Sequence, residues 1–85
     1  MTAHAIKPGS LMHVALRHVD GATLPRVAGG RFRRGGRSVS ADRATALVGA
    51  GLAAFNVNGG GRTTGLTITA YGRAALADIA ERIKP

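Results

Sequence analysis

The sequence predicts a small α+β domain whose elements follow the order helix, hairpin, helix, hairpin, helix. Three observations predict it. Three segments place apolar residues at helical spacing after a capping residue, two glycine-rich segments lie between short alternating stretches, and 85 residues allow one core only. The domain is expected over residues 10–85. Residues 1–9 are expected to form an N-terminal tail that ends at Pro8-Gly9.

The first helix is expected after Ser10, because a serine hydroxyl accepts a hydrogen bond from the free N–H groups that begin a helix. Asp20-Gly21 is expected to end it, since glycine readily adopts the conformation found just past a helix end. A helix this short depends on tertiary packing for its stability. The apolar positions at near-helical spacing are Leu11, Val14, Ala15 and Val19.

The segment 23–39 is expected to form a hairpin about Gly29-Gly30, because both glycines tolerate the positive φ of a two-residue turn. This register would pair Val27 with Phe32 on an apolar face. It would also pair Arg26 with Arg33 and Ala28 with Arg31, which gives the hairpin a second, basic face. Alternatively, Gly35-Gly36 could begin a plain loop.

The second helix is expected from Ser40 to Gly51, with Ser40 as its cap and Asp42 in the first turn, where the helix dipole favours an anion. Its buried face would consist of Ala44, Leu47, Val48 and Leu52.

A second hairpin is expected next, because Phe55 and Val57 alternate with asparagines, and Leu66 and Ile68 alternate with threonines. Its glycine-rich tip would span 58–65. Thr69 would then cap the last helix, whose apolar stripe is expected at Leu76, Ile79, Ala80 and Ile83.

The charge balance favours an acidic partner. Twelve Lys and Arg face four Asp and Glu, so the net charge is +8, and nucleic acid is the commonest partner of such a chain. The codons of a GC-rich genome also produce many arginines, but here four of the ten lie within residues 29–37. This clustering favours a role in binding an anionic partner over genome composition as the reason for the arginines. A charged strand edge that prevents aggregation would show the same cluster.

Several other functions find little support in the sequence. The chain has no cysteine, which excludes disulfides and thiolate metal sites, and its three histidines do not converge on a metal site. Only four carboxylates are present and no nucleophile has a recognisable base, so neither an enzyme nor a cofactor is expected. No apolar run is long enough to span a membrane and no signal-peptide core is present, so a cytoplasmic protein without membrane contact is expected.

Three motifs follow one another within residues 40–83: the helix end ALVGAGLA (46–53), the glycine-rich hairpin NVNGGGRTTG (56–65), and LTITAYGRAAL (66–76). In this order and spacing they resemble the second half of a winged-helix DNA-binding domain, in which the glycine-rich hairpin is called the wing. The upstream half departs from the family, because a Gly/Arg hairpin stands where such domains have a further helix. The resemblance implies a double-stranded DNA partner and a role in bacterial or phage transcription regulation.

The resemblance also implies which residues contact DNA. The helix Ser40–Gly51 would enter a groove with Ser40, Arg43, Thr45 and Ala46 near its front. Arg43 is the strong bidentate partner for guanine among them. Arg62 at the wing tip would contact the minor groove or the backbone. Many winged-helix regulators dimerise, so the last helix is a candidate dimer contact. The phosphate contacts of the first hairpin would come from Arg26, Arg31, Arg33, Arg34 and Arg37.

A different class of function uses the same charge. The protein could be an interaction module, or a phage-type inhibitor, that binds an acidic surface of a host protein that handles nucleic acid. Binding to random duplex DNA with a clear salt dependence would distinguish the DNA-binding protein from this alternative.

Overall fold

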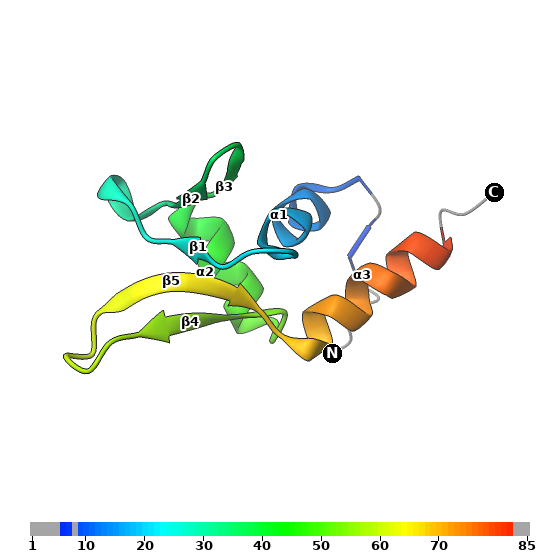
Figure 1. Cartoon of the computed structure of the whole chain (residues 1–85). Helices are drawn as coiled ribbons and strands as arrows, with labels where there is room; N and C mark the ends of the chain where they lie inside the picture. The colour runs from blue at the N-terminus through cyan, green and yellow to red at the C-terminus, as the bar shows by residue number, and fades with distance from the viewer. Residues whose placement is uncertain (1–5, 8, 83–85) are drawn as a thin grey trace.

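The computed structural model describes residues 6, 7 and 9–82, and it confirms an α+β chain with three helices and small antiparallel sheets (Figure 1). The helices are α1 (Leu11–Val19), α2 (Ala41–Gly49) and α3 (Ala70–Arg82), with one 3-10 turn, η2 (Ala28–Gly30). The strands are β1 (Leu24–Pro25), β2 (Phe32–Arg34), β3 (Arg37–Val39), β4 (Ala53–Val57) and β5 (Thr63–Ile68).

The strands form two separate antiparallel sheets. One has the order β1-β5-β4, in which Leu66 of β5 pairs with Leu24 on one side and with Phe55 on the other. The second is the β2–β3 hairpin, in which Phe32 pairs with Val39. The β4–β5 hairpin extends away from the helices at the left of Figure 1, and α3 runs away from it at the right.

A single cluster of buried apolar side chains holds these elements together. Every helix contributes to it, as do β1 and β5, and aliphatic side chains fill its centre. The rings of Phe32 and Phe55 lie 5.7 Å apart, so the two sheets meet through an aromatic contact. The side chains with almost no exposed surface are Leu16, Val19, Leu24, Leu47, Leu52, Leu66 and Ile79.

The three predicted helix caps are confirmed. The Ser10 hydroxyl accepts from the His13 N–H at 3.2 Å, and the Ser40 hydroxyl accepts from the Arg43 N–H at 3.2 Å. Thr69 accepts from the Gly72 N–H at 3.0 Å, and its own hydroxyl donates to the Gly51 carbonyl at 2.7 Å. Each cap satisfies N–H groups that have no partner inside the helix, so local chemistry sets where the helices begin.

The predicted register of the first hairpin is wrong. The two strands turn at Gly35-Gly36, between β2 and β3, and Arg26 bridges to Phe32 rather than to Arg33. Gly29 and Gly30 do have the expected positive φ, 84° and 80°, but they lie in η2. Val27 is exposed while Phe32 is buried against Val39 and Phe55, so tertiary burial of the aromatic ring outweighs the local turn preference.

Two of the predicted apolar faces also differ from the structure. In α1, Leu11 is 68% and Val14 40% exposed, whereas Leu16 and His13 are buried. In α3 the buried positions are Gly72, Ala75 and Ile79, while Ala80 is exposed and Ile83 lies outside the described residues. The rest of each predicted face is buried or partly buried: Ala15 and Val19 in α1, and Leu76 and Ile79 in α3. Close backbone packing at Gly72 determines which side of α3 faces the core.

The end of the predicted tail approaches the rest of the chain. Residues 1–5 and 8 lie outside the described residues, but Ile6 is partly buried against the core and its carbonyl accepts from Arg82 Nη2 at 3.4 Å. Among the described residues, no helix is long and apolar enough to cross a bilayer.

We expect the fold to lose stability as the pH falls below the ordinary pKa of histidine, because of His13. Its buried ring accepts a hydrogen bond from the Gly9 N–H at 2.8 Å, and burial, followed by the nearby charge of Arg17, lowers its pKa from 6.5. The unfolded chain therefore binds more protons than the folded chain between the lowered value and 6.5, and stability falls as pH falls through that window.

The urea midpoint measured from pH about 7.5 down to about 5 tests this. The midpoint should fall in the native chain and fall less in His13→Gln, which keeps a polar acceptor without an ionisable ring. Parallel curves for the two proteins would show that His13 is not responsible.

Candidate nucleic-acid interface

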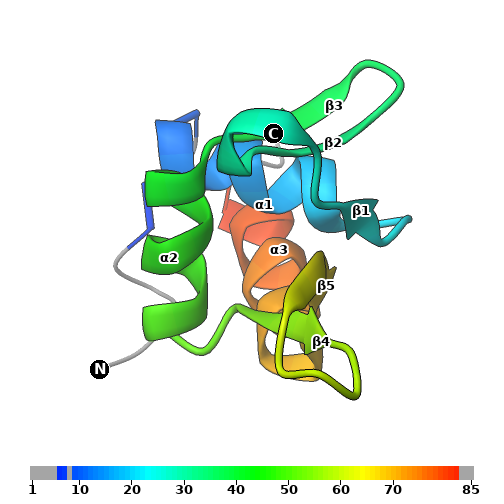
Figure 2. The same ribbon diagram turned by 90° about the vertical axis from the view of Figure 1, so that its left-hand side faces the viewer.

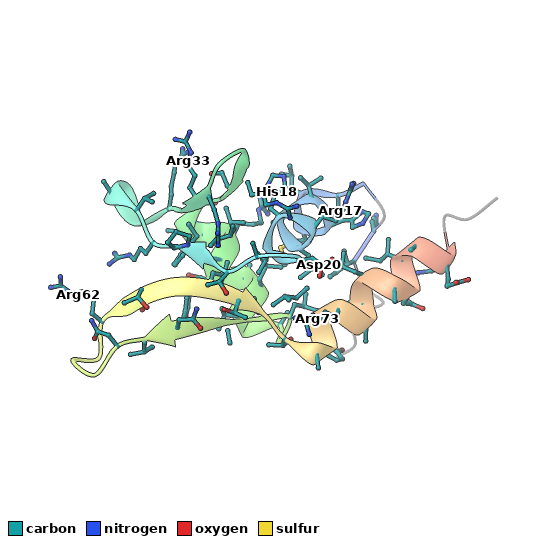
Figure 3. The ribbon with its side chains drawn as sticks, viewed as in Figure 1. Arg17, His18, Asp20, Arg33, Arg62 and Arg73 are labelled. Carbon is teal, nitrogen blue, oxygen red and sulfur yellow. The ribbon has the colours of Figure 1, made fainter. Side chains whose placement is uncertain are left out.

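The tip of the β4–β5 hairpin presents Arg62. The Asn58 side-chain oxygen accepts from the N–H groups of Gly60 at 2.9 Å and Arg62 at 3.0 Å, and the Asn58 N–H donates to the Arg62 carbonyl at 3.0 Å. These bonds close the tip over 58–62, which is shorter than the predicted 58–65. The Arg62 side chain extends outward from it (Figure 3). The hairpin therefore holds a cation at a fixed backbone position, far from the helices.

A groove of about 250 Å³ lies beside this hairpin, and we call it the Thr45 groove. It combines side chains from the η2 loop, from α2 and from β4–β5, so Arg26 and Thr45, predicted from distant parts of the chain, come together here. The Thr45 hydroxyl donates to the Ala41 carbonyl at 3.0 Å. The lining residues are Arg26, Gly30, Phe32, Ala41, Thr45, Phe55 and Thr63.

Arg43 does not share this groove. It is half-buried and lines a second cavity of about 160 Å³, between the start of α2 and α1, together with Ser40. Because consecutive helical residues are rotated by about 100°, positions 43 and 45 face nearly opposite sides of α2. The Ser40 hydroxyl is already used as the cap. The structure thus keeps Ser40 and Arg43 together but places Thr45, which the resemblance groups with them, on another side of the helix.

The side of α2 that faces solvent carries short side chains. Its exposed residues are Ala41, Asp42, Thr45, Ala46 and Gly49. A helix with such a surface can approach another molecule closely, but Thr45 and Asp42 are the residues on it that carry hydrogen-bonding side chains.

The β2–β3 hairpin concentrates positive charge. Arg34 pairs directly with Arg37 across the two strands, and Arg33 pairs with Ser38. Like charges placed opposite each other destabilise a strand pair, so a bound anion would relieve repulsion at this turn. Arg31 precedes β2 and is also exposed.

Arg37 differs from the other hairpin arginines because it contacts the end of α1. Its Nη1 donates to the Asp20 carbonyl at 2.7 Å and to the Arg17 carbonyl at 3.4 Å. A cation at the C-terminus of a helix interacts favourably with the helix dipole. Arg37 therefore stabilises α1 in addition to any contact that it makes with a ligand.

The arginines of these surfaces have no carboxylate partner in the part of the chain that the structure describes. The ion pair described there joins Arg82 to Asp78, 3.3 Å apart on α3. The uncompensated positive side chains are Arg26, Arg31, Arg33, Arg34, Arg37, Arg43 and Arg62. Their charge is available to an external anion.

The sequence prediction missed Arg17 and His18. With Val14 and Arg37 they line a third cavity, of about 330 Å³, between α1 and β3. The signal was present, because positions 14, 17 and 18 lie on one side of a helix. It was missed because Val14 was expected to be buried. Among residues 6, 7 and 9–82, no three His, Asp or Glu side chains are grouped so as to hold a metal ion.

No protein-family model, no curated protein and no solved structure matches this chain. The likeness to winged-helix domains therefore stays a prediction from the sequence.

Proposed function

We propose that this protein binds double-stranded DNA as a small winged-helix-like regulator of transcription in a bacterium or a phage. The observation that carries the proposal is the common orientation of three elements. In Figure 2, α2, the η2 loop and the tip of the β4–β5 hairpin face the viewer together. Arg26 and Thr45 line the groove between these elements, and Arg62 lies at the hairpin tip.

In this proposal the arginines supply most of the affinity. Arg62 would contact the backbone on one side of the Thr45 groove, and Arg26 and Arg31 would contact it near the η2 loop. Arg33 lies at the margin formed by the β2–β3 hairpin (Figure 3). Guanidinium groups suit phosphate because their planar N–H donors match its oxygens in pairs. Such contacts orient the protein on the duplex and carry no sequence information.

Base reading would be limited. The solvent-facing side of α2 offers Thr45, whose methyl group can contact thymine, and Asp42, which can accept from cytosine. Arg43 faces α1, so in this proposal it does not reach a guanine. We therefore propose a protein with strong general affinity for DNA and modest discrimination between sequences.

Fluorescence anisotropy with a random-sequence duplex at several salt concentrations tests the proposal. If Arg26, Arg31, Arg33, Arg34 and Arg62 each neutralise a phosphate, the log–log slope of affinity against salt should be about −4 to −5. Arg73→Ala, which removes a charge from α3 at a distance from the hairpin tip, should leave the slope nearly unchanged (Figure 3). Undetectable binding at low salt would exclude the proposed function.

A further inference from the structure

A second surface lies along the exposed side of α1 and does not involve the Thr45 groove. The cavities of about 330 Å³ and about 160 Å³ both include Val14 and His18, so they adjoin, and we call the two together the α1 groove. It runs between α1 and β3 to the start of α2. Arg17 and His18 lie on α1, well away from Arg62 at the hairpin tip (Figure 3).

The α1 groove has an apolar part. Leu11 and Val14 lie one helical turn apart, and both are exposed, at 68% and 40%. Ala15 and Val39 line the groove beneath them. A chain this small has a limited core, so burial of these two aliphatic side chains would add to its stability. They are exposed to solvent instead. Their exposure is accounted for if an apolar side chain of another molecule covers them.

The charged side chains that line the α1 groove are all positive. Its charged or ionisable lining residues are Arg17, His18, Arg37 and Arg43, and no carboxylate lines either cavity. Asp20 and Asp42 lie outside the lining. The surface is therefore complementary to a ligand that carries negative charge beside an apolar group.

Arg37 is already positioned for such a ligand. Two hydrogen bonds hold its Nη1 on the carbonyls of Asp20 and Arg17, and no hydrogen bond is described for its Nε and Nη2. These two nitrogens form the side of a guanidinium that binds a carboxylate through two parallel hydrogen bonds. Because the side chain is held in advance, less conformational entropy is lost when the carboxylate binds.

We infer that the α1 groove binds an acidic peptide segment of a partner protein. One apolar side chain of the segment packs on Leu11 and Val14, and its carboxylates bind Arg37 and Arg17. The apolar contact favours a peptide over nucleic acid, since a phosphate backbone has no group that gains from covering two aliphatic side chains. The inference does not rest on the proposed DNA binding, which uses other residues.

Selection of random peptides displayed on phage, with the full chain as the target, tests this inference. Enriched sequences should carry several Asp or Glu near an apolar residue. A synthetic copy of the most enriched peptide should bind Arg17→Ala and Leu11→Ser about tenfold more weakly than the native chain. Both side chains are exposed, and no hydrogen bond of the Arg17 guanidinium is described, so these variants should fold. Arg37→Ala is avoided because Arg37 also supports α1.

Matched controls remove the same kinds of group elsewhere. Arg73→Ala takes away a charge on α3 and Val57→Ser takes away an exposed apolar side chain on β4, and both should bind the peptide like the native chain. The inference would be overturned if no peptides were enriched, or if the enriched peptides lacked acidic residues. It would also be overturned if Arg17→Ala and Leu11→Ser bound the peptide as tightly as the native chain does.

A duplex DNA titration separates the two proposals. If Arg17→Ala and Leu11→Ser weaken duplex binding as much as peptide binding, the α1 groove belongs to a nucleic-acid surface and the inference is wrong. Loss of DNA binding without loss of peptide binding, in variants of Arg26 or Arg62, would leave the inference supported. Peptide binding by a chain that fails to bind any duplex would remove the proposed function alone.

Discussion

Gly72→Ala is expected to destabilise the protein by about 3 kcal/mol, a large share of the stability of a domain this small. Gly72 is buried in the first turn of α3, where a Cβ would overlap the Leu52 carbonyl oxygen and lie 2.8 Å from Ile68 Cγ1. Neither neighbour can move easily. The Leu52 carbonyl accepts from the Thr69 N–H at 3.1 Å, and Ile68 is part of the core.

Gly49→Ala is the matched control for this prediction. Gly49 lies in α2, is exposed, and a Cβ there would meet nothing within 4 Å. Alanine should therefore stabilise α2 by about 0.5–1 kcal/mol, because it loses less conformational freedom than glycine when a helix forms. Urea unfolding followed by circular dichroism measures both variants. A Gly72→Ala midpoint at or above that of the native chain would contradict the close approach of α3 to Leu52.

We expect the triple variant Arg26→Ala, Arg31→Ala, Arg62→Ala to bind duplex DNA about 100-fold more weakly than the native chain at low salt. The log–log slope of its affinity against salt concentration should be less steep by about 3. The reason is that each arginine contributes one released counterion if it contacts a phosphate. All three side chains are exposed, and no side-chain hydrogen bond or ion pair is described for them, so folding should be unaffected. The loss should be the same for every DNA sequence, since these contacts do not read bases.

A control variant with an equal loss of charge distinguishes local contacts from general attraction. Arg17→Ala combined with Arg73→Ala and Arg82→Ala removes three charges from α1 and α3. For this variant, the log–log slope of DNA affinity against salt concentration should stay close to that of the native chain. Equal losses in the two triple variants would mean that net charge, rather than the surface around the Thr45 groove, attracts DNA.

Features that depend on a few neighbouring residues were predictable. The caps at Ser10, Ser40 and Thr69 were correct because a hydroxyl and a free N–H three residues apart meet whatever the rest of the fold does. The α+β class was correct because helical and alternating apolar patterns are local. The glycines with positive φ were recognised at Gly29 and Gly30 for the same reason.

The sequence identified many residues of the candidate site, but not which of them lie close together in the structure. The arginines of segment 26–37 and Arg62 are exposed, as their clustering indicated. Their grouping was not predictable. Arg26 meets Thr45 because the η2 loop folds over α2, and Arg43 is turned toward α1 by the packing of Ala44 and Leu47 in the core.

The sequence by itself therefore determined where helices begin, which segments turn, and how much positive charge the surface carries, because these follow from interactions within a few residues. Tertiary structure alone decided the register of the first hairpin and the faces of α1 and α3. Phe32 is buried with Val39 and Phe55, and Gly72 lets α3 approach Leu52. Such contacts join residues far apart in the chain, and the area they bury outweighs the local preferences from which the sequence was interpreted.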